Sequence, residues 1–284
     1  MYCFCMRRSI QYFILFAVIF GLSCKNVRTE STAEPSIQED ATLQADDSSE
    51  AALINDTIPD SSESQKTQLT YPHPGFVYVK DYVPDVVEDI RYSTDNNFMG
   101  AVVNGYKSNV AIITKEAAER LKEAADELRD DGYVIKIYDS YRPQKAVDHF
   151  VRWAKTSDQK KKANYYPDIS KKNLFPRYIA SKSGHSKGST LDLTICDAMT
   201  KVEVDMGSHF DYFGPPSHTM FLGSYQEGNA KKKVEKKHQE NRLYLKRVME
   251  RHGFTNYANE WWHYTLKKEP YPKKYFDFDV SVNP

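Results

Sequence analysis

The chain has 284 residues, a formal net charge of zero and 40% hydrophobic residues, which is enough to build the core of a globular domain. The charge is unevenly distributed, because residues 25–70 carry ten acids and three bases whereas residues 71–284 carry a net charge of +5. A net charge this small on a domain of this size does not indicate a nucleic-acid partner.

The first segment in chain order is typical of a targeting signal and is excluded from the fold. Arg7 and Arg8 precede an apolar run, Ile10–Leu22, that is shorter than the ~20 residues of a membrane-spanning helix. With the following Cys24, residues 1–24 resemble a bacterial lipoprotein signal, although the usual Leu lies one position closer to the cysteine. We therefore expect an exported lipoprotein, anchored in a membrane through Cys24 on the periplasmic or cell-surface side. A cleaved soluble form and an uncleaved anchor are the alternatives.

Residues 25–70 are rich in Ser, Thr, Glu, Asp and Ala and poor in large apolar residues. Such a composition cannot bury enough surface to fold, so we interpret this segment as a disordered acidic tether. The folded domain is then residues 71–284. Its single cysteine, Cys196, ends an alternating apolar stretch, so we expect no internal disulfide and a buried structural role for this residue.

The spacing of apolar residues in this domain predicts a mixture of strands and helices. Strands are predicted at 76–79, 134–138 and 189–195, with a strand pair across 254–266. Helices are predicted at 114–131, capped by Thr114 and ended by Gly132, at 144–155, and at 231–251, where the basic surface is interpreted as solvated. Residues 156–180 are expected to be a long irregular connection. Because strands and helices do not alternate strictly, we expect a single compact α+β domain with a mainly antiparallel sheet flanked by helices.

Two short segments about seventy residues apart supply the side chains of a catalytic zinc site. The first contains His185 and Asp192, and the second contains Glu260 and His263. Two imidazoles and one carboxylate can hold zinc with a coordination position left open, and a second carboxylate can act as a general base. Residues three apart do not share a side of a regular strand, so the chain must turn at 260–263 if both side chains are to reach one site.

Each of these residues alone has a simpler explanation. His185 alone is more typical of a surface or structural histidine, and Asp192 of a salt-bridge partner. A third segment, Tyr138–Pro143, places Arg142 directly after a predicted strand, where its guanidinium is suited to bind an oxyanion. Alone, this arginine would be interpreted as one half of a surface salt bridge. The three segments together favour an enzyme site.

On these residues the chain resembles the D-alanyl-D-alanine dipeptidases. These are zinc peptidases of the vancomycin-resistance type, within the larger group of peptidoglycan D,D-peptidases and L,D-endopeptidases. The family patterns Ser-x-His-x-x-Gly-x-x-x-Asp, Glu-x-Trp-His and Tyr-Arg-Pro are met at 183–192, 260–263 and 141–143. Stretches near 81–98 and 206–211 also look like blocks of that family, so the resemblance spans roughly 74–275.

The resemblance implies zinc-dependent hydrolysis of the dipeptide D-Ala-D-Ala in cell-wall metabolism, with one Zn²⁺ per chain. It implies that His185, Asp192 and His263 bind the metal. It also implies that Glu260 is the base that activates the attacking water, and that Arg142 stabilises the oxyanion that develops at the scissile carbonyl.

The resemblance further implies that Asp211 and Ser183 receive the free ammonium of the dipeptide, which distinguishes a dipeptidase from related wall peptidases. The chain departs from the family pattern at Thr190, where Ala is common. The predicted export also differs from the cytoplasmic resistance enzymes, so a role in resistance does not follow from the resemblance.

Two other functions are kept as alternatives. A zinc D,D-carboxypeptidase or L,D-endopeptidase would share the metal site but act on longer wall peptides through an open cleft. A non-catalytic wall-binding lipoprotein would use zinc only structurally, and the spare carboxylate of Glu260 argues against it. We expect no nucleic-acid partner, and the sequence does not determine the oligomeric state.

Overall fold

The computed structural model describes residues 73–175 and 178–282. The predicted signal segment and tether lie outside these residues, as do the first two residues of the predicted domain. Among the described residues, no helix combines the length and apolar character needed to cross a membrane.

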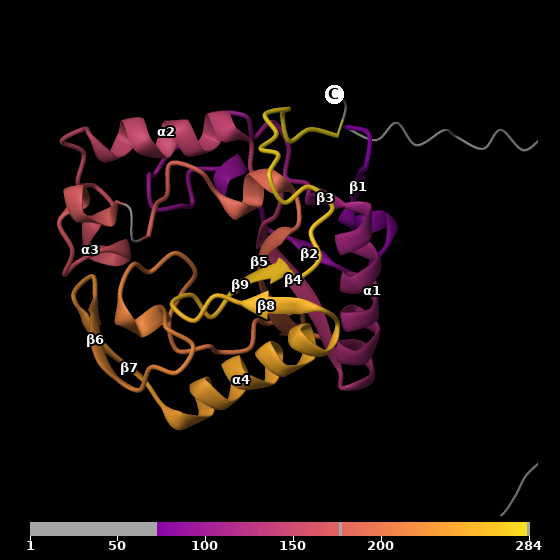
Figure 1. Ribbon diagram of the computed structural model, residues 1–284. Coiled ribbons are helices and arrows are strands. Elements are labelled where there is room, and N and C mark those ends of the chain that lie inside the picture. Colours follow the sequence, from indigo (N-terminus) through magenta and orange to yellow (C-terminus); the bar gives the residue numbers. More distant parts are fainter. Residues whose placement is uncertain (1–72, 176–177, 283–284) are drawn as a thin grey trace, which may run out of the picture. The chain divides into compact units, whose positions relative to one another are not determined.

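The centre of the domain is a five-stranded sheet in the order β2-β4-β5-β9-β8 (Figure 1). Its strands are β2 (Val87–Glu88), β4 (Tyr133–Asp139), β5 (Thr190–Asp197), β8 (Phe254–Asn256) and β9 (His263–Leu266). The pairing of β2 with β4 is parallel, and the pairings of β4 with β5, β5 with β9 and β8 with β9 are antiparallel. The prediction of an α+β domain with a mainly antiparallel sheet is confirmed.

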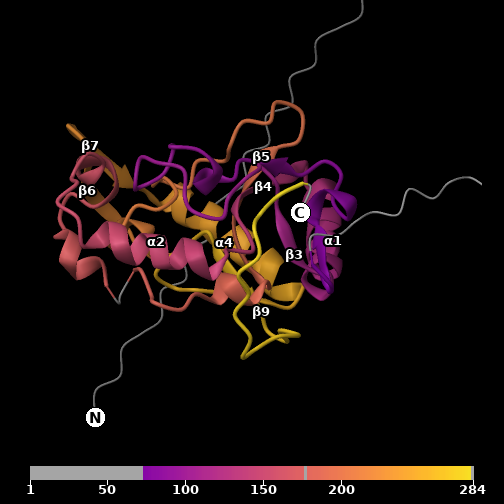
Figure 2. The same cartoon turned by 90° about the horizontal axis from the view of Figure 1, so that it is seen from above.

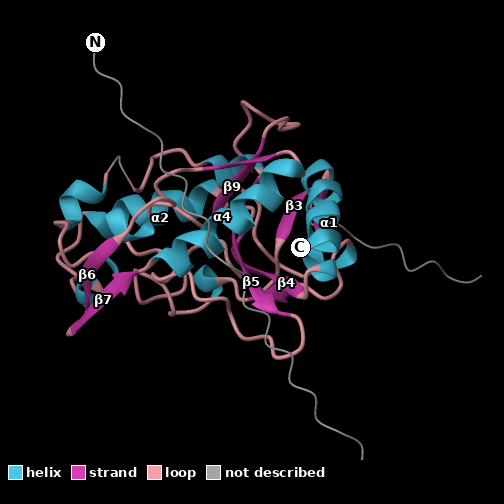
Figure 3. Ribbon diagram, turned by 90° about the horizontal axis from the view of Figure 1, so that it is seen from below, coloured by secondary structure: helices cyan, strands magenta, loops and turns pink. Residues whose placement is uncertain are grey.

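Two smaller antiparallel sheets accompany the central one. The first pairs β1 (Phe76–Tyr78) with β3 (Ile112–Thr114), and the second is a hairpin of β6 (Gly223–Glu227) and β7 (Ala230–Val234). Figures 2 and 3 show this hairpin at the end of the domain opposite to helix α1 (Lys115–Asp130).

The helices contact the sheet and one another. α1 packs against β4, α4 (Lys236–Arg251) packs against β8, and the two helices also contact each other. Two further helices, α2 (Gln144–Ala154) and α3 (Lys162–Tyr165), lie with the β6–β7 hairpin on the side away from α1 (Figure 1). Short 3-10 turns lie at Val79–Asp81, Arg91–Ser93, Lys171–Leu174, Gly184–Lys187 and Pro215–Ser217.

Helix α1 agrees with its prediction in bounds and in its buried face. The buried residues recur at the spacing of three to four that predicted the helix, and they are Ala117, Ala118, Leu121, Ala124, Ala125 and Leu128. Gly132 has a positive φ of 84° just after the helix, as expected for a residue that ends it. The predicted side-chain cap is wrong, because the Thr114 hydroxyl makes a hydrogen bond of 2.7 Å with the Ser189 hydroxyl instead.

The predicted helix 231–251 is wrong at its beginning. Residues 230–234 form strand β7, and the helix begins only at Lys236, after a capping box made by Glu235 and His238. In a helix, the three consecutive lysines 231–233 would give no apolar face to pack against the core. In the hairpin, their side chains are exposed and their backbone pairs with β6.

The sequence pattern also did not predict the burial of Arg242. This residue is fully buried on α4 and donates hydrogen bonds to the Met206 and His218 carbonyls.

The remaining predicted elements are found with small changes of bounds. The strands at 76–79, 134–138 and 189–195 correspond to β1, β4 and β5, the pair across 254–266 to β8 and β9, and the helix at 144–155 to α2. The connection 156–180 is not wholly irregular, since it contains α3 and a 3-10 turn. Cys196 is buried, in agreement with its expected structural role.

Gly188 closes the turn that leads into β5. It has a φ of 87°, and a Cβ atom there would overlap the buried ring of Phe76. Its carbonyl accepts a hydrogen bond of 2.8 Å from the Thr114 amide, which ties the turn to the end of β3. Both the backbone angle and the close ring therefore require glycine.

We predict that Gly188→Ala destabilises the domain more than Gly132→Ala. Gly132 also has a positive φ, of 84°, but a Cβ there would meet no atom within 4 Å. Strain alone should cost Gly132→Ala roughly 1 kcal/mol of unfolding free energy. Gly188→Ala should cost distinctly more, because the Phe76 ring must also move. Urea unfolding of both variants measures the difference, and equal losses would contradict the role given to the ring.

Candidate active site

Three potential metal ligands meet at two neighbouring inner strands of the central sheet, β5 and β9. Asp192 on β5 lies directly opposite His263 on β9 in the antiparallel register. His185 lies in the 3-10 turn Gly184–Lys187, which immediately precedes β5. Strand pairing and one tight turn thus bring together residues that are distant in the sequence.

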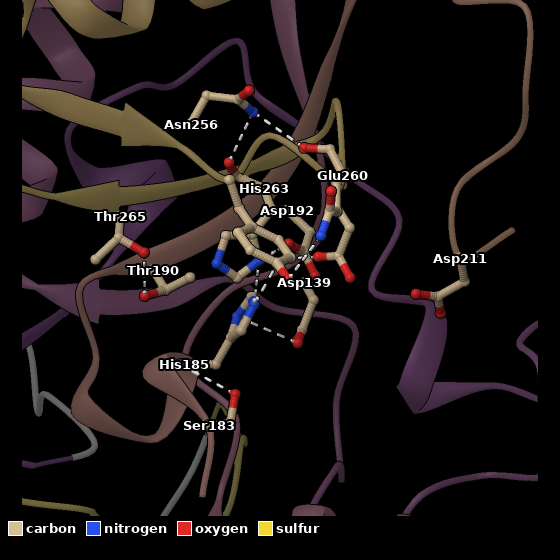
Figure 4. A network of polar contacts seen from close by, with 12 residues as sticks. Asp139, Ser183, His185, Thr190, Asp192, Asp211, Asn256, Glu260, His263 and Thr265 are labelled. Atoms are coloured by element: carbon tan, nitrogen blue, oxygen red, sulfur yellow. Dashed lines mark hydrogen bonds and ion pairs between the residues drawn. The ribbon is translucent and has the colours of Figure 1, made fainter. Parts of the chain in front are cut away.

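The ligand atoms form a compact triangle (Figure 4). The distance from Asp192 Oδ1 is 3.3 Å to His185 Nε2 and 3.0 Å to His263 Nδ1, and the two nitrogens are 3.4 Å apart. Tetrahedral zinc with bonds of about 2.0–2.1 Å needs its ligand atoms about 3.3 Å apart. Asp192 Oδ1 is buried and receives no hydrogen bond from the described part of the chain. The donor set, the spacing and this unsatisfied oxygen all fit a zinc ion.

His185 is held in the tautomer that metal binding needs. Its Nδ1–H donates a hydrogen bond of 2.8 Å to the Ser140 carbonyl, which leaves Nε2 directed at the other ligands. The Asp139 carboxylate lies 3.5 Å from the same Nδ1. Partners of this kind orient a ligating histidine and increase its basicity.

Burial and charge act in opposite directions on the Asp192 carboxyl. Burial alone would favour its neutral form, but the neighbouring His185 and His263 lower its pKa well below the usual range. The carboxylate is therefore ionised, as metal binding requires.

Glu260 lies beside the triangle on a turn that precedes β9. As predicted, the chain turns here, because the His263 amide donates to the Glu260 carbonyl at 3.3 Å. The Asn256 side-chain amide donates to the Glu260 and His263 carbonyls, at 3.0 Å each, and so holds both ends of the turn. Burial, with a contribution from the Asp192 charge, raises the pKa of the Glu260 carboxyl to about 7.

The two tryptophans of this turn are buried and anchor it to the core. Trp261 donates its indole N–H to the Ser208 hydroxyl at 3.1 Å, and Trp262 packs edge-on against Phe210. The position of Glu260 is therefore determined by large buried side chains as well as by the backbone.

Arg142 lies just beyond the end of β4 and is held between two carboxylates. Its Nε–H donates to Asp139 at 2.8 Å, and its Nη2 lies 3.4 Å from Asp192 Oδ2. Although burial opposes its charge, Asp139 keeps the pKa of the guanidinium well above its ordinary value. The site therefore contains a permanent positive charge beside the ligand triangle.

Asp139 is a site residue that the sequence reasoning missed. It is fully buried, accepts a hydrogen bond of 2.6 Å from the Tyr106 hydroxyl, and contacts both Arg142 and the back of His185. A signal was present in the sequence, since this acid lies inside the Tyr138–Pro143 segment, three residues before the arginine. An acid at the end of a buried strand needs a cationic or hydrogen-bonding partner nearby.

Asp211 faces the same pocket from a separate segment. It is buried, and its φ of 63° is unusual for a residue other than glycine. The Tyr92 hydroxyl donates a hydrogen bond of 2.8 Å to its carboxylate. Burial, followed by the charge of Asp192, raises the pKa of Asp211 well above its ordinary value. Among the described residues this carboxylate has no salt bridge, so it lacks a direct cationic partner.

All seven candidate residues line one pocket of about 260 Å³, which also receives aromatic side chains such as Phe98 and Phe150. Figure 4 shows Ser183 beside His185, with Asp211 on another side of the triangle. The Ser183 hydroxyl accepts a hydrogen bond of 3.2 Å from the His185 amide. The assignment of Ser183 to the substrate ammonium stays a prediction.

The departure at Thr190 is accommodated locally. Its hydroxyl makes a hydrogen bond of 3.0 Å with the hydroxyl of Thr265, its partner in the β5–β9 register (Figure 4). The extra oxygen is therefore satisfied within the sheet and leaves the ligand triangle unchanged.

Residues 73–281 match the family model described as D-ala-D-ala dipeptidase. A D-alanyl-D-alanine dipeptidase from Enterococcus faecalis is 42% identical over 209 residues, which is 73% of this chain and 98% of that protein. One from Streptomyces coelicolor is 38% identical and covers 72% of this chain and 98% of its own length.

This chain belongs to the D-alanyl-D-alanine dipeptidase family. The resemblance noted from the three motifs is thereby confirmed. A solved structure of a vancomycin resistance D,D-pentapeptidase in complex with Zn(II) covers 57% of this chain and 76% of that chain, at 16% identity and a TM-score of 0.33.

Proposed function

We propose that this protein hydrolyses D-alanyl-D-alanine to two D-alanines in cell-wall metabolism, as a zinc-dependent dipeptidase. Family membership over residues 73–281 supports the reaction class. The ligand triangle with a carboxylate beside it supports metal-assisted hydrolysis.

The observation that carries the specificity is the buried carboxylate of Asp211. A buried carboxylate without a cation is costly, and a positively charged ligand group removes that cost. Asp211 lines the same pocket as the ligand triangle, so a free ammonium bound there belongs to a substrate whose scissile bond lies at the metal site. A dipeptide has its ammonium that close to its peptide bond, whereas the amino end of a longer wall peptide is distant.

His185, Asp192 and His263 are the residues that would hold zinc. When bound, zinc supplies a Lewis acid that polarises the scissile carbonyl and lowers the pKa of a water molecule. Glu260, whose carboxylate is 3.4 Å from His263 Nδ1, accepts a proton from the attacking water. As the C–N bond breaks, Glu260 donates that proton to the leaving amine nitrogen.

Arg142 stabilises the negative charge that develops on the carbonyl oxygen. Its guanidinium is fixed by Asp139 before the substrate binds, so no reorganisation is needed during the reaction. Asp139 acts as a positioning residue, because it contacts both the arginine and the metal-ligating histidine.

The alternatives kept from the sequence have less support. A D,D-carboxypeptidase or L,D-endopeptidase needs room for a long peptide and gives Asp211 no counter-charge. A non-catalytic wall-binding lipoprotein has no use for a carboxylate held beside the metal ligands by Asn256 and two buried tryptophans.

We also propose that the enzyme works outside the cytoplasm, attached by lipid at Cys24 to a membrane. The short apolar run before this cysteine and the acidic segment 25–70 after it support this location. The family match begins at residue 73, close to the predicted domain boundary at 71. Two or more acyl chains anchor a protein stably, whereas a single chain gives only weak binding.

A pair of variants separates metal binding from chemistry. His185→Ala should lose most of the bound zinc and nearly all activity, because two ligands make a weak site. Glu260→Gln should keep its zinc but lose roughly 10²–10⁴-fold in turnover, because the general base is removed. Metal analysis and D-Ala release on both purified proteins measure these effects. Stoichiometric zinc in His185→Ala, or near-normal turnover in Glu260→Gln, would contradict the assignments.

The ammonium site predicts a strict requirement for a free amino group. N-acetylated D-Ala-D-Ala should be a very poor substrate, because acetylation removes the charge that Asp211 binds and adds bulk in a small pocket. Asp211→Asn should lose activity on the free dipeptide and narrow the difference between the two substrates. Comparable kcat/KM values on both substrates with the unaltered enzyme would favour a carboxypeptidase.

The location is tested by cell fractionation. Cys24→Ser should release the enzyme from the membrane fraction or leave its signal segment uncleaved, because the acylated side chain is gone. Ser23→Ala, next to it, serves as the matched control and should stay in the membrane fraction. Recovery of the unaltered protein in the cytoplasm with its first 24 residues intact would refute the proposal.

A further inference from the structure

The pocket contains few positive charges that are available to a substrate. Besides the two histidines of the ligand triangle, its cationic lining residues in the described part of the chain are Arg142 and Lys182. Arg142 is already paired with Asp139 and Asp192. Lys182 has no salt bridge among the described residues.

The backbone on both sides of Lys182 is held in place. The Ser181 carbonyl accepts a hydrogen bond of 3.1 Å from the Gln144 side chain, and the Ser183 hydroxyl accepts one from the His185 amide. Lys182 therefore has a defined position relative to a metal ligand three residues later.

Lys182 lines the pocket and is exposed to solvent. It lies 4.6 Å from the centre of the Tyr275 ring, and that tyrosine is 36% exposed. A ring at this distance attracts a cation without neutralising it, so the Lys182 charge can still pair with an anion.

The substrate of the proposed reaction has one charge at each end. If its ammonium pairs with Asp211 and its peptide bond lies at the ligand triangle, its carboxylate extends away from Asp211. Lys182 adjoins Ser183, which Figure 4 shows beside His185 and apart from Asp211. The carboxylate of the leaving D-alanine is thus directed to the part of the pocket where an uncommitted lysine lies.

We propose that Lys182 binds the C-terminal carboxylate of the dipeptide and so selects substrates with a free acid at that end. This assignment rests on the proposed function and deepens it. Together, Asp211 and Lys182 would bind the two charged ends of the zwitterionic dipeptide and thereby limit the substrate to two residues. Arg142 is then available to stabilise the charge on the scissile carbonyl oxygen.

The test compares D-Ala-D-Ala with its C-terminal amide, D-Ala-D-alaninamide, on three variants. Lys182→Met should lower kcat/KM for the acid by roughly tenfold or more, which is the usual weight of a hydrogen bond to a charged group, and mainly through KM. Its kcat/KM for the amide should stay within about twofold of the original, because the amide has no charge to lose. Lys182→Arg should restore the preference for the acid. Lys155→Met, an exposed lysine outside the pocket lining, is the control and should change neither value.

The outcomes distinguish a failure of the proposed dipeptidase function from a failure of the role given to Lys182. If the unaltered enzyme hydrolyses neither compound, the proposed function fails. If it is active and Lys182→Met keeps the original preference for the acid, the function stands and the role of Lys182 is wrong. Equal losses on both substrates would also overturn this role, because they indicate a structural effect of the lysine.

Discussion

The antiparallel pairing of β5 with β9 is the constraint on which the rest of the site depends. It places Asp192 opposite His263, 71 residues later in the chain, and positions the turn that carries Glu260. The turn that carries His185 leads directly into β5. The pairing of β5 with β9 therefore fixes Asp192 and His263, and the beginning of β5 fixes the turn of His185. A slip of one residue in this register would turn either Asp192 or His263 to the opposite face and remove the metal site.

The site concentrates carboxyl groups in a small volume. Four carboxyl groups, on Asp139, Asp192, Asp211 and Glu260, lie around a single arginine, and burial raises the pKa of three of them. Such an arrangement is stabilised by cations, which in the proposed function are the metal at Asp192 and the substrate ammonium at Asp211. The chemistry therefore depends on positive groups that the chain itself does not supply.

Much of this could be predicted from the sequence, because motifs and apolar spacing are local. The His185–Asp192 and Glu260–His263 motifs predicted side chains that the structure brings together, and helical spacing predicted all six buried residues of α1. The role of Glu260 as the base stays a prediction. Asp139 was missed because its contacts with Tyr106 and His185, which are distant in the sequence, form only in the fold. The β6–β7 hairpin was missed because its lysines carry no apolar signal, and strand formation there depends on the partner strand. Lipid attachment and the domain boundaries stay predictions.

The sequence separation of the ligands also affects how the protein acquires its metal. His185 and Asp192 are joined by a single turn and can approach each other early in folding, but two ligands hold zinc only weakly. The third ligand, His263, joins the other two when β9 pairs with β5. Among the described strands, β9 is the last in chain order. Tight metal capture is thus coupled to completion of the sheet, and a nascent or partly folded chain competes poorly for zinc. Bound metal would then stabilise the completed sheet and slow the unfolding of the domain.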